Sequence, residues 1–492
     1  MPAVIRSLLD SLHAELASIV GVEGLLHHAE ELVAYECDAY TLEKHPPDLV
    51  VLPRTTDEVV RIVNLCRELQ LPIIPRGAGT SLSGAVLPVT GGVMIALTRM
   101  NRMISIDVGN RRALVEAGCV NAWITNAVKA NGLFYAPDPS SQSACTIGGN
   151  VATNSGGPHT LKYGVTTNHV LGFEMVLPSG DLIWLGTTPD GGEEVDGYDL
   201  RGAVIGSEGM FGIVTKVLVR LIPAPESFKT LLGVFNSVDE ASQTVSDIIA
   251  AGIVPGALEM MDQLITHAVE AAYAFGFPLD AGAVLIVELD GLAAGPAESR
   301  ASSSIERQAA LVQEICRKNG AREVRVAKDA AERALLWKCR KRAFGAIGRL
   351  SPNFLTQDGV VPRSKLPEIM RFIQETSCKY ALRIPNVFHA GDGNIHPLVL
   401  YDERDPEQVR KAVQAGEEIL GKCIELGGSA SGEHGIGVEK IDFMPRQFDA
   451  ASLEAMKRLR AVFDPELRCN PHKMFPGSKR CGDFSPRKQA SA

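Results

Sequence analysis

The sequence lacks the features that mark several large classes of protein. No run in its 492 residues approaches the ~18 to 20 consecutive apolar positions that are needed to cross a bilayer. The N-terminal stretch mixes charged side chains into a helical rhythm, unlike the unbroken apolar core of a signal peptide. The ten cysteines form no C-x-x-C pair, which argues against a disulfide framework and against an iron–sulfur cluster in this chain. The basic residues are dispersed and the formal charge is −9, so we expect no nucleic-acid partner. Because the N-terminal stretch indicates an ordinary amphipathic helix, we expect a cytoplasmic protein.

The sequence does contain enough apolar material for at least two domains, because 45% of its residues are hydrophobic. Residues 55–70 begin with Thr55 and Glu58, which have the spacing of a capping box. Their apolar positions share one helical face, namely Val59, Ile62, Val63, Cys66 and Leu69. With β-rich runs on either side, this pattern predicts an α+β domain. From Phe228 helices and strands alternate, which indicates a second domain.

Glycine is concentrated in three loops of the first domain. The stretch "PRGAGTSLSG" (75–84) lets several backbone N–H groups face one anion, but it lacks the lysine of a P-loop and the spacing of a Rossmann turn. By itself it fits a plain structural loop equally well. Residues 137–157 repeat the combination of glycine with small polar side chains, and "GSEGMFGIVTKV" (206–217) adds a third loop. A dinucleotide with a pyrophosphate needs several such backbone approaches, and together the three loops provide them.

These loops, with "YGVTTNHVLGFEMVLPSGD" and the C-terminal "NPHKMFP", resemble the FAD-binding domain of the vanillyl-alcohol-oxidase superfamily. The resemblance is closest to the flavin subunit of glycolate oxidase and to the D-lactate and D-2-hydroxyglutarate dehydrogenases. It implies an α+β fold with a two-part FAD-binding domain and a separate α+β substrate (cap) domain. Ala78 and His472 depart from the family, each replacing a usual glycine. No histidine lies in the two main flavin loops, so we expect FAD to be bound non-covalently.

The resemblance also divides the chain into segments. We predict an N-terminal helical segment (1–47), an FAD-binding domain (48–225), a cap domain (226–430), a return to the FAD domain (431–477) and a disordered tail (478–492). The residues expected to bind FAD are Pro75, Arg76, Gly77, Ala78, Gly79, Thr80, Ser81, Pro137, Ser141, Thr146, Gly148, Gly149, Asn150, Thr153, Asn154, Gly156, Gly157, Tyr163, Gly164, Glu208, Gly209, Gly212, Ile213, Val214 and Asn470.

A second constellation lies around two histidines in "VFHAGDGNIHPLVL". If Asp392 and Gly393 form a two-residue turn, His389 faces His396 directly across a hairpin, with Cβ atoms roughly 5 Å apart. Two imidazoles so placed can bind one metal ion, and Glu433 can complete a two-histidine, one-carboxylate set. A tight hairpin with hydrogen-bonded histidines is an equally good interpretation of the spacing alone.

The resemblance favours the metal site over the hydrogen-bonded hairpin. In the related dehydrogenases the matching segments supply metal ligands and a base, which correspond here to His389, His396 and Glu433 for the ion and to His434 for proton removal. A divalent ion, zinc first with manganese or iron as alternatives, lowers the pKa of a substrate hydroxyl while the Cα hydride moves to flavin N5. Adjacent side chains on extended backbone point apart, so a kink at Gly432 or Gly435 is expected.

A carboxylate substrate also needs a cation, and "WKCRKRAFGAIGR" offers Arg340, Lys341, Arg342 and Arg349. Arg340 best matches the substrate-binding arginine of the related dehydrogenases, and the alternative is a solvated basic helix face. The partners that 2-hydroxyglutarate enzymes use further along correspond to Phe344 and Thr356. This disfavours a dicarboxylate and leaves glycolate or D-lactate.

We therefore expect an FAD-dependent 2-hydroxyacid dehydrogenase. The alternative is a flavin-binding subunit without a catalytic site that serves assembly or electron relay in a larger oxidase, but the histidine–carboxylate set argues for the enzyme. A metal hydrolase leaves the glycine-rich loops unexplained. Because no cluster motif is visible, reduced flavin needs an external acceptor, and the resemblance implies an iron–sulfur subunit leading to quinone. With such a partner, the protein could be a homo- or hetero-oligomer. It could also lie at the membrane surface through the partner subunit.

Overall fold

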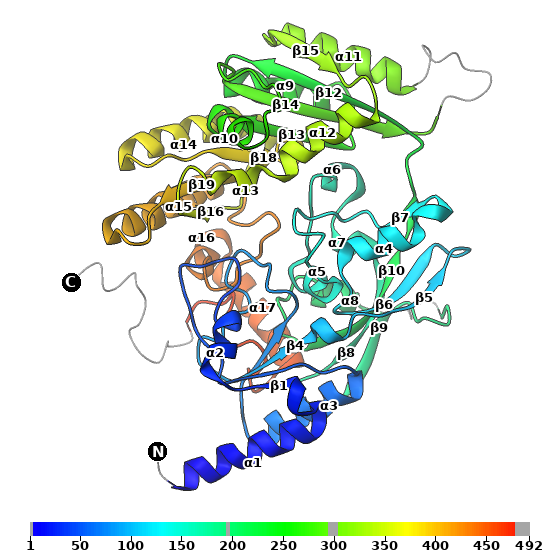
Figure 1. Ribbon diagram of the computed structural model, residues 1–492, viewed down its shortest axis with the longest axis vertical. Coiled ribbons are helices and arrows are strands. Elements are labelled where there is room, and N and C mark those ends of the chain that lie inside the picture. The colour runs from blue at the N-terminus through cyan, green and yellow to red at the C-terminus, as the bar shows by residue number, and fades with distance from the viewer. Residues whose placement is uncertain (1–2, 193–196, 294–303, 478–492) are drawn as a thin grey trace. The chain divides into compact units, whose positions relative to one another are not determined.

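The computed structural model describes residues 3–192, 197–293 and 304–477, and its described residues form two compact units (Figure 1). Unit 1 comprises residues 3–156, 165–192, 197–224 and 433–477. Unit 2 comprises residues 157–164, 225–293 and 304–432. The tail predicted for 478–492 lies outside the described residues. Among the helices of the described residues, none is both long and apolar enough to cross a membrane.

Unit 1 opens with a four-stranded sheet in the order β1-β2-β4-β3. Its strands are β1 (Leu25–Leu26), β2 (Leu49–Val51), β3 (Ile73–Arg76) and β4 (Val93–Ala96). Strands β2, β4 and β3 are parallel, and α3 (Thr56–Glu68) connects β2 to β3. Thr55 caps α3 by accepting the N–H of Glu58, but the Glu58 carboxylate accepts the N–H of Arg54 and so does not close the expected box.

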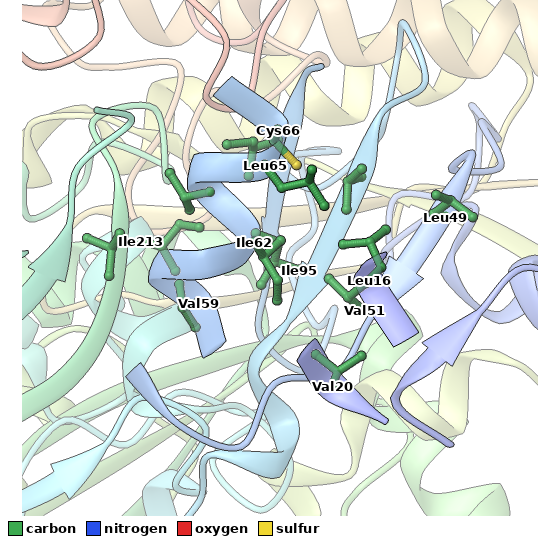
Figure 2. Close-up of a cluster of buried hydrophobic side chains, with 14 of the residues drawn as sticks. Leu16, Val20, Leu49, Val51, Val59, Ile62, Leu65, Cys66, Ile95 and Ile213 are labelled. Atoms are coloured by element: carbon green, nitrogen blue, oxygen red, sulfur yellow. The ribbon is translucent and has the colours of Figure 1, made fainter. Parts of the chain in front are cut away.

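Apolar side chains of α1 (Ala3–Val20), α3 and this sheet form one buried core (Figure 2). The cluster includes Leu16 and Val20 of α1, Val51 of β2, Ile62 of α3 and Ile95 of β4, which Figure 2 labels. Of the predicted apolar face of α3, only Leu69 is exposed, because the helix ends at Glu68.

The second sheet of unit 1 is antiparallel, with the order β5-β6-β10-β8-β9. Its strands are β5 (Met103–Asp107), β6 (Arg112–Glu116), β8 (Val170–Val176), β9 (Leu182–Gly186) and β10 (Ile213–Arg220), and β7 (Leu133–Phe134) pairs separately with β11 (Ile222–Pro223). Other helices of unit 1 are α2 (Ala29–Leu32), α4 (Asn121–Val128), α5 (Ile147–Thr153), α7 (Thr166–His169), α8 (Leu200–Val204), α16 (Met444–Gln447) and α17 (Ala450–Phe463).

The last described segment pairs with the first sheet of unit 1. Cys469 forms a parallel bridge with Ile73 of β3. The N–H of Ile73 donates to the carbonyl of Arg468, and the N–H of Asn470 donates to the carbonyl of Ile73. Residues after 432 are thereby joined to the strand that precedes the first glycine-rich loop.

Unit 2 is built on a large antiparallel sheet with the order β15-β12-β14-β13-β18-β19-β16, and β17 pairs with β19. Its strands are β12 (Ser227–Phe235), β13 (Ala257–Asp262), β14 (Ala283–Gly291), β15 (Glu323–Val326), β16 (Asn353–Thr356), β17 (Gly359–Val360), β18 (Asn386–His389) and β19 (Asn394–Tyr401). Its helices are α6 (Thr160–Tyr163), α9 (Val238–Ala250), α10 (Gln263–Tyr273), α11 (Ser304–Lys318), α12 (Ala330–Lys341), α13 (Ala343–Ile347), α14 (Leu366–Tyr380) and α15 (Pro406–Glu425).

Helices α10, α12 and α13 cover one face of this sheet. Leu336 of α12 and Ile347 of α13 share a buried cluster with Met261, Val387 and Leu398 of the central strands. Because side chains alternate along a strand, residues two positions from these point to the same helix-covered face. His389, two residues after Val387, and His396, two before Leu398, meet this condition.

Candidate functional site

The first two glycine-rich loops of unit 1 lie side by side. A Cβ at Gly77 would overlap the hydroxyl of Thr146, which caps α5 by accepting the N–H of Gly149. Gly79 has φ +71°, and a Cβ there would overlap the Arg76 guanidinium. Glycine is therefore required at both positions for this close approach.

The first loop leaves a row of backbone donors unused. The N–H groups of residues 77–80 donate to no acceptor among the described residues, although this stretch is half-buried. Consecutive free N–H groups form a concave anion site. The C-terminal segment closes this region, because Nδ2 of Asn470 donates to the carbonyls of Ala85 and Glu208 at 2.7 and 2.6 Å. Oδ1 of Asn470 is buried without a partner among the described residues and can accept from a ligand.

The two histidines of unit 2 come together, but not in the predicted register. His389 pairs with Asn394 and His396 pairs with Val387, so the prediction that the histidines face each other directly is wrong. The reason is the turn, which takes four residues (390–393) instead of two. The histidines are diagonal neighbours on one face, and their ring centroids lie 5.1 Å apart at 87°. Both side chains are buried.

A buried carboxylate that the sequence reasoning missed orients His389. Glu259 of β13 lies directly across from His389, and its Oε1 is 2.8 Å from Nδ1 of the imidazole. A carboxylate that holds one ring nitrogen of a histidine is the usual orienting partner in a carboxylate–histidine–metal triad. An acidic residue inside the apolar strand "ALEMMD" was the available signal.

Arg340 joins the same centre from α12. Its Nη2 is 2.6 Å from Oε2 of Glu259 and 3.4 Å from Nδ1 of His389. The side chain is 1% exposed, and its Nε and Nη1 have no hydrogen-bond partner among the described residues. The other three candidate cations, Lys341, Arg342 and Arg349, are exposed.

A second missed carboxylate, Asp358, lies beside His396. Its Oδ1 is 3.8 Å from Nδ1 of His396, and its Oδ2 accepts the hydroxyl of Ser431 and the N–H of Gly432, each at 2.9 Å. The buried Asp358 side chain thus ties the histidine-bearing sheet to the end of the unit 2 chain. Glu433 follows Gly432 directly.

Comparison with known proteins also divides the chain into two parts. The family described as "FAD binding domain" matches residues 47–186, and "FAD linked oxidases, C-terminal domain" matches residues 224–474. The chain belongs to the FAD-linked oxidases. It is an FAD-dependent oxidoreductase with the two-part fold expected for the vanillyl-alcohol-oxidase superfamily.

This FAD-linked oxidase has curated relatives over nearly its whole length. It is 44% identical to glycolate oxidase subunit GlcD of Escherichia coli (strain K12), covering 95% of this chain and 91% of the relative. It is 41% identical to the GlcD subunit of Bacillus subtilis (strain 168), covering 95% and 97%. It is 32% identical to the D-lactate dehydrogenase of Anaerostipes hadrus, covering 88% and 90%.

Solved structures confirm the fold alone, because their sequences are distant. p-Cresol methylhydroxylase with bound substrate superposes with a TM-score of 0.80 at 18% identity, covering 95% of this chain and 96% of the other. The 4-ethylphenol oxidase from Gulosibacter chungangensis gives 0.76 at 17% identity, covering 96% and 98%.

The residues of this FAD-linked oxidase that were expected to bind FAD are divided between the units. Most lie in unit 1, where the donors of residues 77–80 and Oδ1 of Asn470 suit the phosphates and polar ring edges of FAD. Gly157, Tyr163 and Gly164 belong to unit 2, where the Tyr163 hydroxyl contacts Asp290 and Lys162 donates to the same carboxylate. Both oxygens of the Glu208 carboxylate accept backbone N–H groups.

Glu433 and His434 open the last segment of unit 1 and are half-buried. The carbonyl of His434 accepts a hydrogen bond from the Ser83 hydroxyl at 3.1 Å. Of the two glycines at which a kink was expected, Gly435 has φ +86°, which turns the chain immediately after His434.

Proposed function

We propose that this FAD-linked oxidase is a dehydrogenase that oxidises a small 2-hydroxy acid, glycolate or D-lactate, to the 2-oxo acid. The observation that carries the proposal is the buried guanidinium of Arg340 beside His389. It is anchored to Glu259 through Nη2 and retains two unpartnered donors, Nε and Nη1. A buried donor without a partner is costly, and a substrate carboxylate would satisfy it with charge-assisted hydrogen bonds.

His389, His396 and Glu433 are the proposed ligands of a divalent ion. Two buried imidazoles with 5.1 Å between their centroids suit one ion, and Glu259 fixes the ring of His389 through Nδ1. Chain continuity supports Glu433, because the N–H of its neighbour Gly432 is held by Asp358 next to His396. The imidazole-rich set favours zinc, with manganese or iron as alternatives.

When bound, FAD accepts a hydride at N5 and the divalent ion acts as a Lewis acid toward the substrate hydroxyl. The chain's own residues do the rest. Arg340 orients the substrate by its carboxylate, and His434 takes the hydroxyl proton as general base. Ser83 and the turn at Gly435 hold the backbone of His434 on either side.

The surroundings of the histidines favour a small substrate. The ring of Phe344 lies 6.4 Å from the ring of His396, and a phenyl group offers no partner to a second carboxylate. This argues against a dicarboxylic 2-hydroxy acid. The relatives named for glycolate and D-lactate point to the same two candidates.

Reoxidation of the reduced enzyme requires an electron acceptor outside this chain. The relatives that are named as glycolate oxidase subunits support a hetero-oligomer. We propose that an iron–sulfur subunit leading to quinone receives the electrons and that the FAD is held non-covalently.

Single-turnover flavin reduction tests the proposal. The purified protein should be yellow, should release its FAD on acid precipitation, and should bleach with glycolate or D-lactate faster than with L-lactate or D-2-hydroxyglutarate. His389→Ala, His396→Ala and Glu433→Ala should lose bound metal and activity together. His434→Ala should keep metal and FAD but slow flavin reduction roughly 100-fold, which is the usual effect of losing a positioned base.

Two outcomes would contradict the proposal. A wild-type protein with full FAD and metal that bleaches with none of these acids would instead support a flavin-binding subunit without its own catalytic site. Full activity of the three ligand variants in metal-free buffer would make the hairpin purely structural.

A further inference from the structure

Glu208 joins three distant segments of unit 1. It lies in the third glycine-rich loop with φ +52°, a conformation that non-glycine residues rarely adopt. Its N–H donates to the carbonyl of Ala152 at 2.7 Å, and its own carbonyl accepts Nδ2 of Asn470 at 2.6 Å. The backbone of Glu208 is therefore fixed against the second glycine-rich loop and the C-terminal segment.

The carboxylate of Glu208 holds the chain that follows His434. Oε1 accepts the N–H of Ile436 at 2.6 Å, and Oε2 accepts the N–H of Gly437 at 2.8 Å. A Cβ at Gly435 would come within 2.6 Å of Oε1, so only glycine permits this approach. The residues from His434 to Ile436 form neither helix nor strand, and these bonds replace the regular hydrogen bonds that the segment lacks.

Ser83 holds the same segment through three further bonds. Its hydroxyl donates to the His434 carbonyl, and its carbonyl accepts the N–H groups of Val438 and Glu439 at 3.0 and 3.2 Å. The backbone around His434 is thus fixed by one contact before the Gly435 turn and by several after it.

We infer that Glu208 is a positioning residue, which holds the backbone next to His434 so that the imidazole is placed for proton removal. The inference rests on the proposed role of His434. The inference gives Glu208 a task other than direct contact between its carboxylate and FAD, since each of its oxygens accepts a backbone N–H group of the segment that follows His434.

The burial of this acidic side chain supports a specific role. The Glu208 side chain is 4% exposed, and burial raises the pKa of its carboxyl, while the N–H groups of Ile436 and Gly437 and the side chains of Lys473 and Lys440 oppose that rise. An uncharged packing residue would avoid this desolvation. A carboxylate supplies two strong acceptors at fixed separation, which neither a hydrophobic residue nor a single carbonyl can provide.

Glu208→Gln tests the inference, because its amide keeps one acceptor and turns an N–H₂ group toward the other backbone N–H. We expect the rate constant of flavin reduction to fall roughly 10- to 100-fold, the scale of a small misplacement of a catalytic group. The apparent substrate affinity and FAD content should stay within twofold of wild type, and the pH profile of reduction should shift from that of wild type. The matched control is Glu116→Gln, at a buried glutamate of unit 1 that accepts the N–H of Arg102, and it should leave all four quantities unchanged.

Hydrogen exchange separates failure of this inference from failure of the proposed function. In Glu208→Gln, the amides of Ile436 and Gly437 should exchange at least 10-fold faster, whereas those of the Glu116→Gln protein should not. Gly435→Ala, which leaves the carboxylate in place but displaces the chain from it, should give the same faster exchange even if the glutamate variant folds poorly.

Unchanged exchange at these amides in a folded Glu208→Gln protein would overturn the inference whatever the activity. Faster exchange with a wild-type rate and pH profile of flavin reduction would overturn it as well, because the contact would then be structural only. If His434→Ala keeps the wild-type rate, it is the proposed base that fails, and the exchange result still reports whether Glu208 holds the loop.

Discussion

The two units offer their binding groups in different chemical forms. In unit 1 the candidate cradle consists of backbone N–H groups on glycine-rich loops, and its glycines allow close approach. In unit 2 the candidate centre consists of charged and imidazole side chains buried against one sheet, with Glu259 shared between His389 and Arg340. A backbone cradle binds an anion without burying a protein charge. A side-chain centre must pair every charge that it buries.

The largest expected effect is on the free energy of unfolding, and it tests whether unit 2 depends on its buried charges. Glu288 accepts hydrogen bonds from Thr230, Arg333 and Trp337. Burial would raise the pKa of its carboxyl, but bonds from His159, Arg333 and Trp337 prevail and hold the pKa at about 2.

A depressed folded-state pKa gives stability that is present above the unfolded value of 4.5 and is lost as pH falls toward 2. From the shift we expect about 3 kcal/mol of unfolding free energy to depend on pH in this window. Urea unfolding of wild type and Glu288→Gln between pH 6 and 2 measures it. The variant should be less stable at pH 6 and converge with wild type at the acid end, and parallel curves would contradict the assignment.

The second effect is a loss of FAD affinity, and it should follow only from substitutions in the backbone cradle. Gly79→Ala places a methyl group on the Arg76 guanidinium at φ +71°, and we expect FAD affinity to fall roughly 100-fold through overpacking of the loop. Gly132→Ala is the matched control, because Gly132 has φ +67° but nothing within 4 Å of the added carbon. Both variants bear the backbone strain, so equal FAD loss by fluorescence titration would refute a local cradle.

A smaller effect should separate metal binding from flavin binding. Glu259→Gln removes the charge that orients His389, and metal affinity should fall roughly 30-fold while FAD affinity is unchanged. Competition with a chromogenic chelator measures the metal. Glu288→Gln, another buried glutamate of the same sheet, should bind metal as wild type does. An equal loss in that protein would point to general disruption of the sheet.

The smallest effect should concern the substrate alone. Arg340→Lys keeps a charge near Glu259 but loses the planar guanidinium, so the substrate concentration for half-maximal flavin reduction should rise roughly 10-fold. Arg342→Lys is the control, because Arg342 is exposed and lies over the ring of Tyr273. An unchanged half-maximal concentration for Arg340→Lys would mean that Arg340 pairs with Glu259 but does not bind the substrate carboxylate.

Sequence patterns predicted local features well and pairings less well. The apolar face of α3 is buried from Val59 to Cys66, because helical periodicity is a property of consecutive residues. The hairpin was predicted, but its strand register was wrong because the turn has four residues (390–393) instead of two. Asp-Gly favours a two-residue turn only when the flanking strands pair up to it, and here pairing ends at His389 and Asn394.

By itself the sequence determined that the first glycine-rich loop follows a strand, that two histidines share a hairpin and that Arg340 lies on a helix. Each of these follows from residues a few positions apart. Only the tertiary structure decided that Glu259 and Asp358 join the histidines, and that Glu208 binds the segment beyond His434. Glu259 and His389 are 130 positions apart, and Glu208 and Ile436 are 228 apart. Contacts over such separations depend on strand order and on which buried groups still need hydrogen bonds, and no local pattern records either.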